Sequence, residues 1–131
     1  MEVSMTKNDL PTLRLLARNT SQIHYSIHGH SQMLARGYST TDVERILTSN
    51  TNQLIEVQPP CLVRGPRFHK DPRYVISDPA FHPDTAVVIA LDFSVPSSPL
   101  IWVITVEPAL NAIWDKDPTK DPWLTRIGTM V

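Results

Sequence analysis

A histidine and an arginine occupy opposite ends of one short predicted helix, and the pair suits phosphate chemistry. Ser26 is a good N-cap, because its hydroxyl can accept a backbone N–H of the first turn, and His28 falls in that turn. Arg36 falls in the last turn, and Gly37 can take the left-handed conformation that ends a helix. Imidazole exchanges protons near neutral pH, and guanidinium binds phosphate oxygens. The stretch therefore predicts a phosphate-handling site or an ordinary capped helix.

The other histidines nearby are expected to stay outside such a site. His30 should point away from His28 and face solvent, because two residues turn a helix by about 200°. His24 lies just before the helix in a short extended segment, residues 23–25. A zinc site built from His24 and His28 would lack a third ligand at useful spacing. Cys61 is the only cysteine, so neither a metal site of the multi-cysteine type nor an internal disulfide is possible.

Two predicted strands supply further candidates. Arg73 and Tyr74 are adjacent in one of them, where the guanidinium could hold a phosphate and the ring could stack on a base. Thr105 is a polar residue in the apolar strand 100–106, and alternation would turn it away from both of its neighbours. Each has an ordinary alternative, since Arg73 could lie on a solvated strand face and Thr105 is a good β-former.

The charge of the chain limits how it could bind nucleic acid. The 131 residues are 41% hydrophobic and 19% charged, with a net charge of −1. Domains that hold long nucleic acid by bulk electrostatics are usually basic, so a local basic site would be needed. The best candidate is a loop with several prolines, although a solvated loop is the alternative; its basic residues are Arg64, Arg67, His69 and Lys70.

The order of the predicted elements indicates an α+β domain, with two to three short N-terminal helices packed on a four-stranded antiparallel sheet. Helix signals cover 9–19, 26–37 and 39–48, and strand signals cover 53–57, 73–76, 85–93 and 100–106. We expect a single domain over 1–131. Its parts are a helical extension at 9–19, a core at 23–107 and an irregular tail at 108–131 with several prolines.

The apolar strand 100–106 is expected at the centre of the sheet, because the residues that face either side of it are apolar. Ile101 and Val103 should share one face, with Leu100, Trp102 and Ile104 on the other. The chain's three tryptophans are expected to be core or interface anchors rather than stacking platforms. No apolar run approaches the ~20 residues of a membrane span, and the N-terminus lacks the apolar segment of a secretory signal. A soluble protein is therefore expected.

Several of these residues together resemble a motif of a bacterial domain family of unknown function. That family has a helix reading T-x-H-A-x-x-R-M-x-x-R-G-I-S, and the matching residues here are Ser26, His28, Met33 and Arg36–Ser39. Asp42-Val43 is similar to the start of its second helix, and 73–75 and 104–106 are similar to its R-Y and closing strands. Two positions depart from the motif: Gln32 stands where the family often has arginine, and Gly29 replaces a small helix former.

This family is similar in architecture to the barnase, EndoU, colicin and RelE class of ribonucleases, known as the BECR fold, which includes many toxins. The resemblance implies a BECR/RelE-like fold and metal-independent RNA cleavage by a module of a toxin–antitoxin or polymorphic-toxin system. It implies a catalytic set of His28, Arg36, Arg73 and Thr105. The residues expected to contact the substrate are Tyr74, Arg64, Arg67 and Lys70.

The implied partners are RNA (tRNA or mRNA) and a cognate antitoxin or immunity protein, with no cofactor and no membrane. The implied location is the cytoplasm, reached directly or by delivery into a target cell as part of a larger secreted protein. Two alternative functions, both of them binding proteins rather than enzymes, remain. One is a non-catalytic protein-binding module on the same fold, which the near-zero net charge and Gln32 favour. The other is a compact immunity protein, which the acidic tail residues favour; these are Asp115, Asp117 and Asp121.

Overall fold

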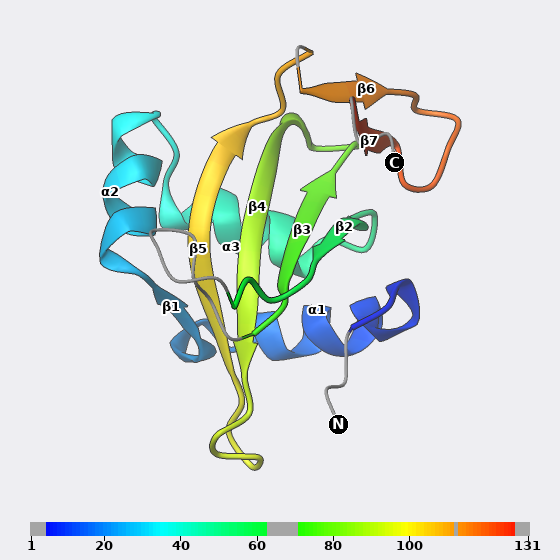
Figure 1. Cartoon of the computed structure of the whole chain (residues 1–131). Helices are drawn as coiled ribbons and strands as arrows, with labels where there is room; N and C mark the ends of the chain where they lie inside the picture. Colours follow the sequence, from blue (N-terminus) through cyan, green and yellow to red (C-terminus); the bar gives the residue numbers. More distant parts are fainter. Residues whose placement is uncertain (1–4, 63–70, 112, 128–131) are drawn as a thin grey trace.

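The computed structural model describes residues 5–62, 71–111 and 113–127, which form an α+β domain (Figure 1). The helices are α1 (Leu10–Arg18), α2 (Ile27–Ala35) and α3 (Thr40–Thr48), with 3₁₀ turns at Lys7–Asp9 and Thr20–Gln22. The strands of the main sheet are β1 (Ile23–Tyr25), β2 (Gln53–Gln58), β3 (Arg73–Asp78), β4 (His82–Asp92) and β5 (Leu100–Pro108). A separate two-stranded sheet pairs β6 (Trp114–Lys116) with β7 (Leu124–Arg126).

The helix ends follow the capping residues of the sequence. The Ser26 hydroxyl accepts the Gly29 N–H at 2.9 Å and begins α2. Gly37 has φ +81, the left-handed conformation that a side chain would disfavour, and it ends the same helix. Ser39 and Asp42 form a reciprocal capping box at the start of α3. The α+β class and these helices are therefore confirmed.

The main sheet is mixed and has five strands in the order β1-β5-β4-β3-β2. The pairs from β5 to β2 are antiparallel, but β1 runs parallel to β5. The four strands predicted from the sequence are present and antiparallel, but the prediction of a four-stranded, purely antiparallel sheet was wrong because it missed the parallel strand β1. Three residues are too few for a periodic signal, and the pairing of β1 depends on a partner almost eighty positions away, with Ile23 opposite Ile101.

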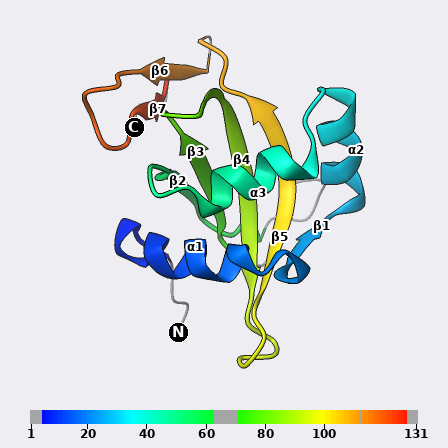
Figure 2. The ribbon, with the colours of Figure 1, turned by 180° about the vertical axis from the view of Figure 1, so that it is seen from behind.

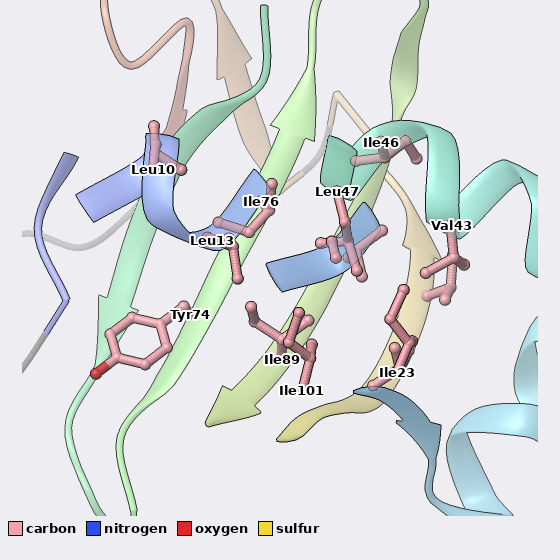
Figure 3. Close-up of a cluster of buried hydrophobic side chains, with 14 of the residues drawn as sticks. Leu10, Leu13, Ile23, Val43, Ile46, Leu47, Tyr74, Ile76, Ile89 and Ile101 are labelled. Atoms are coloured by element: carbon pink, nitrogen blue, oxygen red, sulfur yellow. The ribbon is translucent and has the colours of Figure 1, made fainter. Parts of the chain in front are cut away.

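Helices α1 and α3 cover one face of the sheet, which we call the helix face (Figure 2). Leu13 of α1 and Ile46 of α3 pack there against Ile76 and Ile89 of the sheet (Figure 3). Ile101 and Val103 are fully buried in the same cluster, whereas Ile104 packs against a second cluster. The predicted division of the β5 side chains between the two faces is confirmed for these residues.

The β6–β7 hairpin covers part of the opposite face of the sheet. Trp114 and Trp123 are buried there against Val75 and Val88, so both are core anchors as predicted. The prediction of an irregular tail missed this hairpin. Each of its strands has only three residues, and burial of the tryptophans against the distant sheet holds them in place.

None of the helices in the described ranges is long and apolar enough to cross a membrane.

Candidate functional site

Helix α2 lies along the free edge of β5, beyond the point where β1 ends (Figure 1). The Ser26 backbone N–H donates to the Val103 carbonyl at 3.1 Å, and its hydroxyl donates to the Ile104 carbonyl at 3.3 Å. At the other end of α2, Arg36 Nη1 donates to the Val106 carbonyl at 2.8 Å. The helix and its two ends therefore satisfy backbone groups that an uncovered edge strand would expose.

Gly29 is the residue that permits this close approach. A Cβ at this position would lie 2.6 Å from the Ile104 carbonyl oxygen and 2.8 Å from that of Val103. Those distances are shorter than a methyl group tolerates, so α2 with any other residue would have to move away from the strand. The departure from the family motif at Gly29 thus has a packing reason in this chain.

Arg36 and Thr105, both predicted as catalytic, meet at this edge. Arg36 Nη1 lies 3.4 Å from Thr105 Oγ1, in addition to its bond with the carbonyl. Val88 of β4 pairs with Thr105 of β5, but the next residue of β4, Ile89, pairs with Val103. Ile104 is therefore an extra residue in β5, a β-bulge. This bulge places Thr105 on the face of Val88, together with Ile104. The prediction that Thr105 faces opposite to Ile104 was therefore wrong, because simple alternation cannot anticipate a bulge.

The two histidines of α2 flank Gly29 and point to different sides of the sheet. The His30 ring packs against the ring of Tyr25, with 6.0 Å between centroids, and Tyr25 packs on the helix-face core. Burial, and secondarily the charge of Glu44, raise the pKa of Tyr25 to about 12, so its hydroxyl stays neutral. His28 is one residue before the buried Gly29, about 100° around the helix, and is exposed on the side opposite to His30.

A row of four side chains crosses the sheet face opposite the helices. Adjacent strand positions place Arg73 of β3 beside Ala90 of β4, and Ala90 is paired with Trp102 of β5. Trp102 is paired in turn with His24 of β1, and their ring centroids are 5.1 Å apart. All four are partly exposed. We call the surface formed by Arg73, Ala90, Trp102 and His24 the open face.

The open face combines groups that bind nucleic acid. Trp102 offers a partly exposed ring, and Ala90 is small, so it leaves room between the indole and the guanidinium of Arg73. Asp92 lies two residues further along β4, and its carboxylate accepts the Ser94 backbone N–H at 2.9 Å. This hydrogen bond lowers the pKa of Asp92, with smaller contributions from other hydrogen bonds that include the Trp102 side chain. That carboxylate lies on β4, between the strand of Arg73 and the strand of Trp102, so Arg73 is the member of the row that offers a permanent positive charge to a phosphate.

Tyr74 is not available to stack on a base. It is 2% exposed in the helix-face core, and its hydroxyl accepts the Met5 N–H at 3.0 Å. Adjacent residues of a strand point to opposite faces of the sheet, so Arg73 lies on the open face while Tyr74 lies in the core. The two residues therefore cannot bind the same nucleotide, contrary to the expectation from the sequence. Trp102, expected from the sequence to be a core or interface anchor, is instead partly exposed on the open face and is the aromatic residue available to stack. Its position and that of His24 follow from strand pairing, which the sequence did not reveal.

The proposed catalytic residues therefore form two groups on one side of the sheet. His28, Arg36 and Thr105 lie along α2 and the edge of β5. Arg73 lies two strands away, about 10 Å by the usual strand spacing, so the four do not form one contact cluster. The predicted basic contacts of the loop fall outside the described residues; they are Arg64, Arg67, His69 and Lys70.

Comparisons with protein family models, with curated protein sequences and with solved structures gave no match. The resemblance of residues 23–107 to ribonuclease domains therefore stays a prediction. Within the described ranges, no group of three or more His, Cys, Asp or Glu side chains is arranged to hold a metal ion.

Proposed function

We propose that this chain is a metal-independent ribonuclease that binds single-stranded RNA on the open face and cleaves it beside α2. The observation that carries the proposal is the row formed by Arg73, Ala90, Trp102 and His24. An aromatic ring beside a cation on an exposed strand surface suits a stacked base and its phosphate. Arg36 and His28 lie on the same side of the sheet, at its edge.

The chemistry needs a base, an acid and cations, and this side of the protein supplies candidates for each. One imidazole, of His28 or His24, takes the proton of a ribose 2′-hydroxyl. The resulting oxygen attacks the adjacent phosphorus, and the bond from phosphorus to the 5′-oxygen breaks. The second imidazole gives its proton to that leaving oxygen, so the products are a 2′,3′-cyclic phosphate and a 5′-hydroxyl. Arg73 and the free N–H groups of Arg36 stabilise the charge on the phosphorane.

Cleavage of single-stranded RNA in excess chelator tests this proposal. We expect the protein to remain active and His28→Gln to lose about 10²-fold or more in rate, as for removal of a general acid or base. His30→Gln is the matched control, because His30 packs on Tyr25 at the other side of α2, and we expect near-normal cleavage. Activity that disappears in chelator and returns with zinc or magnesium would contradict the metal-independent mechanism.

We further propose that the ribonuclease acts as the toxin module of a toxin–antitoxin or polymorphic-toxin system. Expression without the cognate antitoxin or immunity protein should then arrest growth, and His28→Gln should relieve the arrest while His30→Gln should not. Equal arrest by the protein and His28→Gln would remove His28 from the toxic mechanism.

A second candidate is a non-catalytic protein-binding module on the same fold. The observation that favours it is the engagement of Arg36, whose Nη1 already donates to the Val106 carbonyl and supports the fold. A protein that cleaves no RNA under any condition and causes no arrest would favour this candidate over the ribonuclease.

A further inference from the structure

A wide apolar groove lies on the helix face, between α1 and the ends of β3 and β4. Its volume is about 910 Å³. Side chains from α1, from the segment before it and from β4 and the residue after it give it an apolar lining, which includes Met5, Leu13, Leu15, Leu16, Leu91 and Phe93. The groove is on the opposite side of the sheet from Arg73 and Trp102, so it is not part of the proposed RNA site.

Large apolar side chains at this groove remain in contact with water. Leu15 is 62% exposed and Phe93 is 59% exposed. Burying such side chains is favourable because it removes apolar surface from water, and contiguous apolar surface of this kind marks sites of interaction. A ligand with an apolar surface would therefore gain stabilisation here.

The backbone around the groove favours a helix over an extended peptide. Strands β3 and β4 are interior strands, so each is already paired on both sides and offers no free edge. Pro72 and Pro99 also line the groove and have no N–H to donate. An extended segment would leave its backbone groups without partners, whereas a helix satisfies its own and presents apolar side chains at i, i+3, i+4 and i+7.

The charged side chains among the described residues that line the groove are both acidic. Asp9 and Asp71 contribute to its lining, and the described residues that line it include no lysine or arginine. We propose that this groove binds an amphipathic helix of a partner protein that carries basic residues beside its apolar stripe. The apolar stripe fills the space between α1 and the sheet, and the basic residues pair with the two carboxylates. This inference does not depend on the proposed ribonuclease activity.

Titration of the full chain with a designed helical peptide tests the inference. The probe is a fluorescent 14-residue peptide with leucine at i, i+3, i+4, i+7 and i+11 and lysine at the flanking positions, and the matched peptide has glutamate in place of lysine. We expect the lysine peptide to bind at least tenfold more tightly by fluorescence anisotropy. Leu15→Ser should weaken its binding at least tenfold, whereas Leu34→Ser should not, because Leu34 is 57% exposed on α2, away from the groove.

The charge contribution is tested by Asp71→Lys against Asp115→Lys, which makes the same change on β6. Only Asp71→Lys should weaken binding of the lysine peptide; Asp9 is left unchanged because its carboxylate also accepts the Thr6 N–H at 2.8 Å. Circular dichroism confirms that each variant is folded. The proposal would be overturned if both peptides bound equally, or if Leu15→Ser and Leu34→Ser lost the same affinity. It would also be overturned if the free protein self-associated and Leu15→Ser abolished this association, because the groove would then bind a second copy of the chain.

Discussion

At the scale of single residues, the guanidinium of Arg36 ties the end of α2 to the last part of β5. It donates to the Val106 carbonyl at 2.8 Å and lies 3.4 Å from Thr105 Oγ1. We expect Arg36→Ala to lower the free energy of unfolding by about 1 kcal/mol, the usual contribution of one such hydrogen bond. Arg18→Ala, at the exposed end of α1, is the matched control and should change it little. Urea denaturation of both variants measures the difference, and equal stability would show that the contact contributes nothing.

The ion pair between Glu56 and Arg126 joins the tail to the main sheet. Arg126 Nε and Nη2 donate to the two carboxylate oxygens at 2.9 and 3.0 Å, and the guanidinium lies 4.6 Å from the centroid of the Trp114 ring. Burial alone would raise the pKa of Glu56, but hydrogen bonds from Arg126 and Gln58 and the charge of Arg126 outweigh it, so the pKa is lowered. The pair therefore stabilises the fold when Glu56 is ionised.

This lowered pKa predicts a loss of stability in acid. The contribution of Glu56 is fully present above its ordinary pKa of 4.5 and is lost as the pH falls through the lower value of the folded state. We expect Glu56→Gln to cost about 1–3 kcal/mol at pH 7, as for charge-assisted hydrogen bonds, and to flatten the stability profile below pH ~5. Glu44→Gln on α3 is the control, since the described residues give Glu44 no ion pair. Melting temperatures from pH 7 to 3 check the prediction, and parallel profiles would contradict it.

At the scale of the elements, the packing of α2 on β5 depends on a glycine. Alanine is normally preferred to glycine in a helix by about 1 kcal/mol. At position 29, however, the added methyl would lie 2.6 Å from the Ile104 carbonyl oxygen, so we expect Gly29→Ala to destabilise the protein by about 1–3 kcal/mol, the usual cost of overpacking. Ser31→Ala, at an exposed position of the same helix, should be neutral or stabilising. A stabilised Gly29→Ala protein would show that α2 can move without cost.

The elements also show what a sequence can reveal. The α2 and α3 boundaries were predictable because Ser26, Gly37 and the Ser39 capping box act within a few residues of the backbone they control. The three-residue strands β1, β6 and β7 were not, because long-range pairing and burial determine them. The candidate site follows the same division. Arg36 and Thr105, two members of the predicted catalytic set, contact each other, but Arg73 does not join them in one contact cluster. The contact of His24 with Trp102 arises only from pairing of β1 with β5.

At the scale of the whole molecule, the sheet separates two surfaces of different chemistry. The helix face carries α1, α3 and an apolar groove whose described lining includes two aspartates, and the other face carries the β6–β7 hairpin and the open face. A net charge of −1 gives the molecule no general attraction for RNA, so specific binding must come from local groups. An arginine on the open face should therefore contribute to RNA affinity, whereas an equivalent arginine on the helix face should not.

The most direct measurement is the affinity for a short single-stranded RNA of Arg73→Ala and of Arg45→Ala at one fixed salt concentration. Both variants remove one positive charge, but Arg73 lies on the open face and Arg45 is exposed on α3 at the helix face. We expect anisotropy titrations to show binding at least fivefold weaker for Arg73→Ala and unchanged for Arg45→Ala. Equal weakening of both would indicate nonspecific electrostatics, and unchanged binding in Arg73→Ala would contradict the placement of RNA on this face.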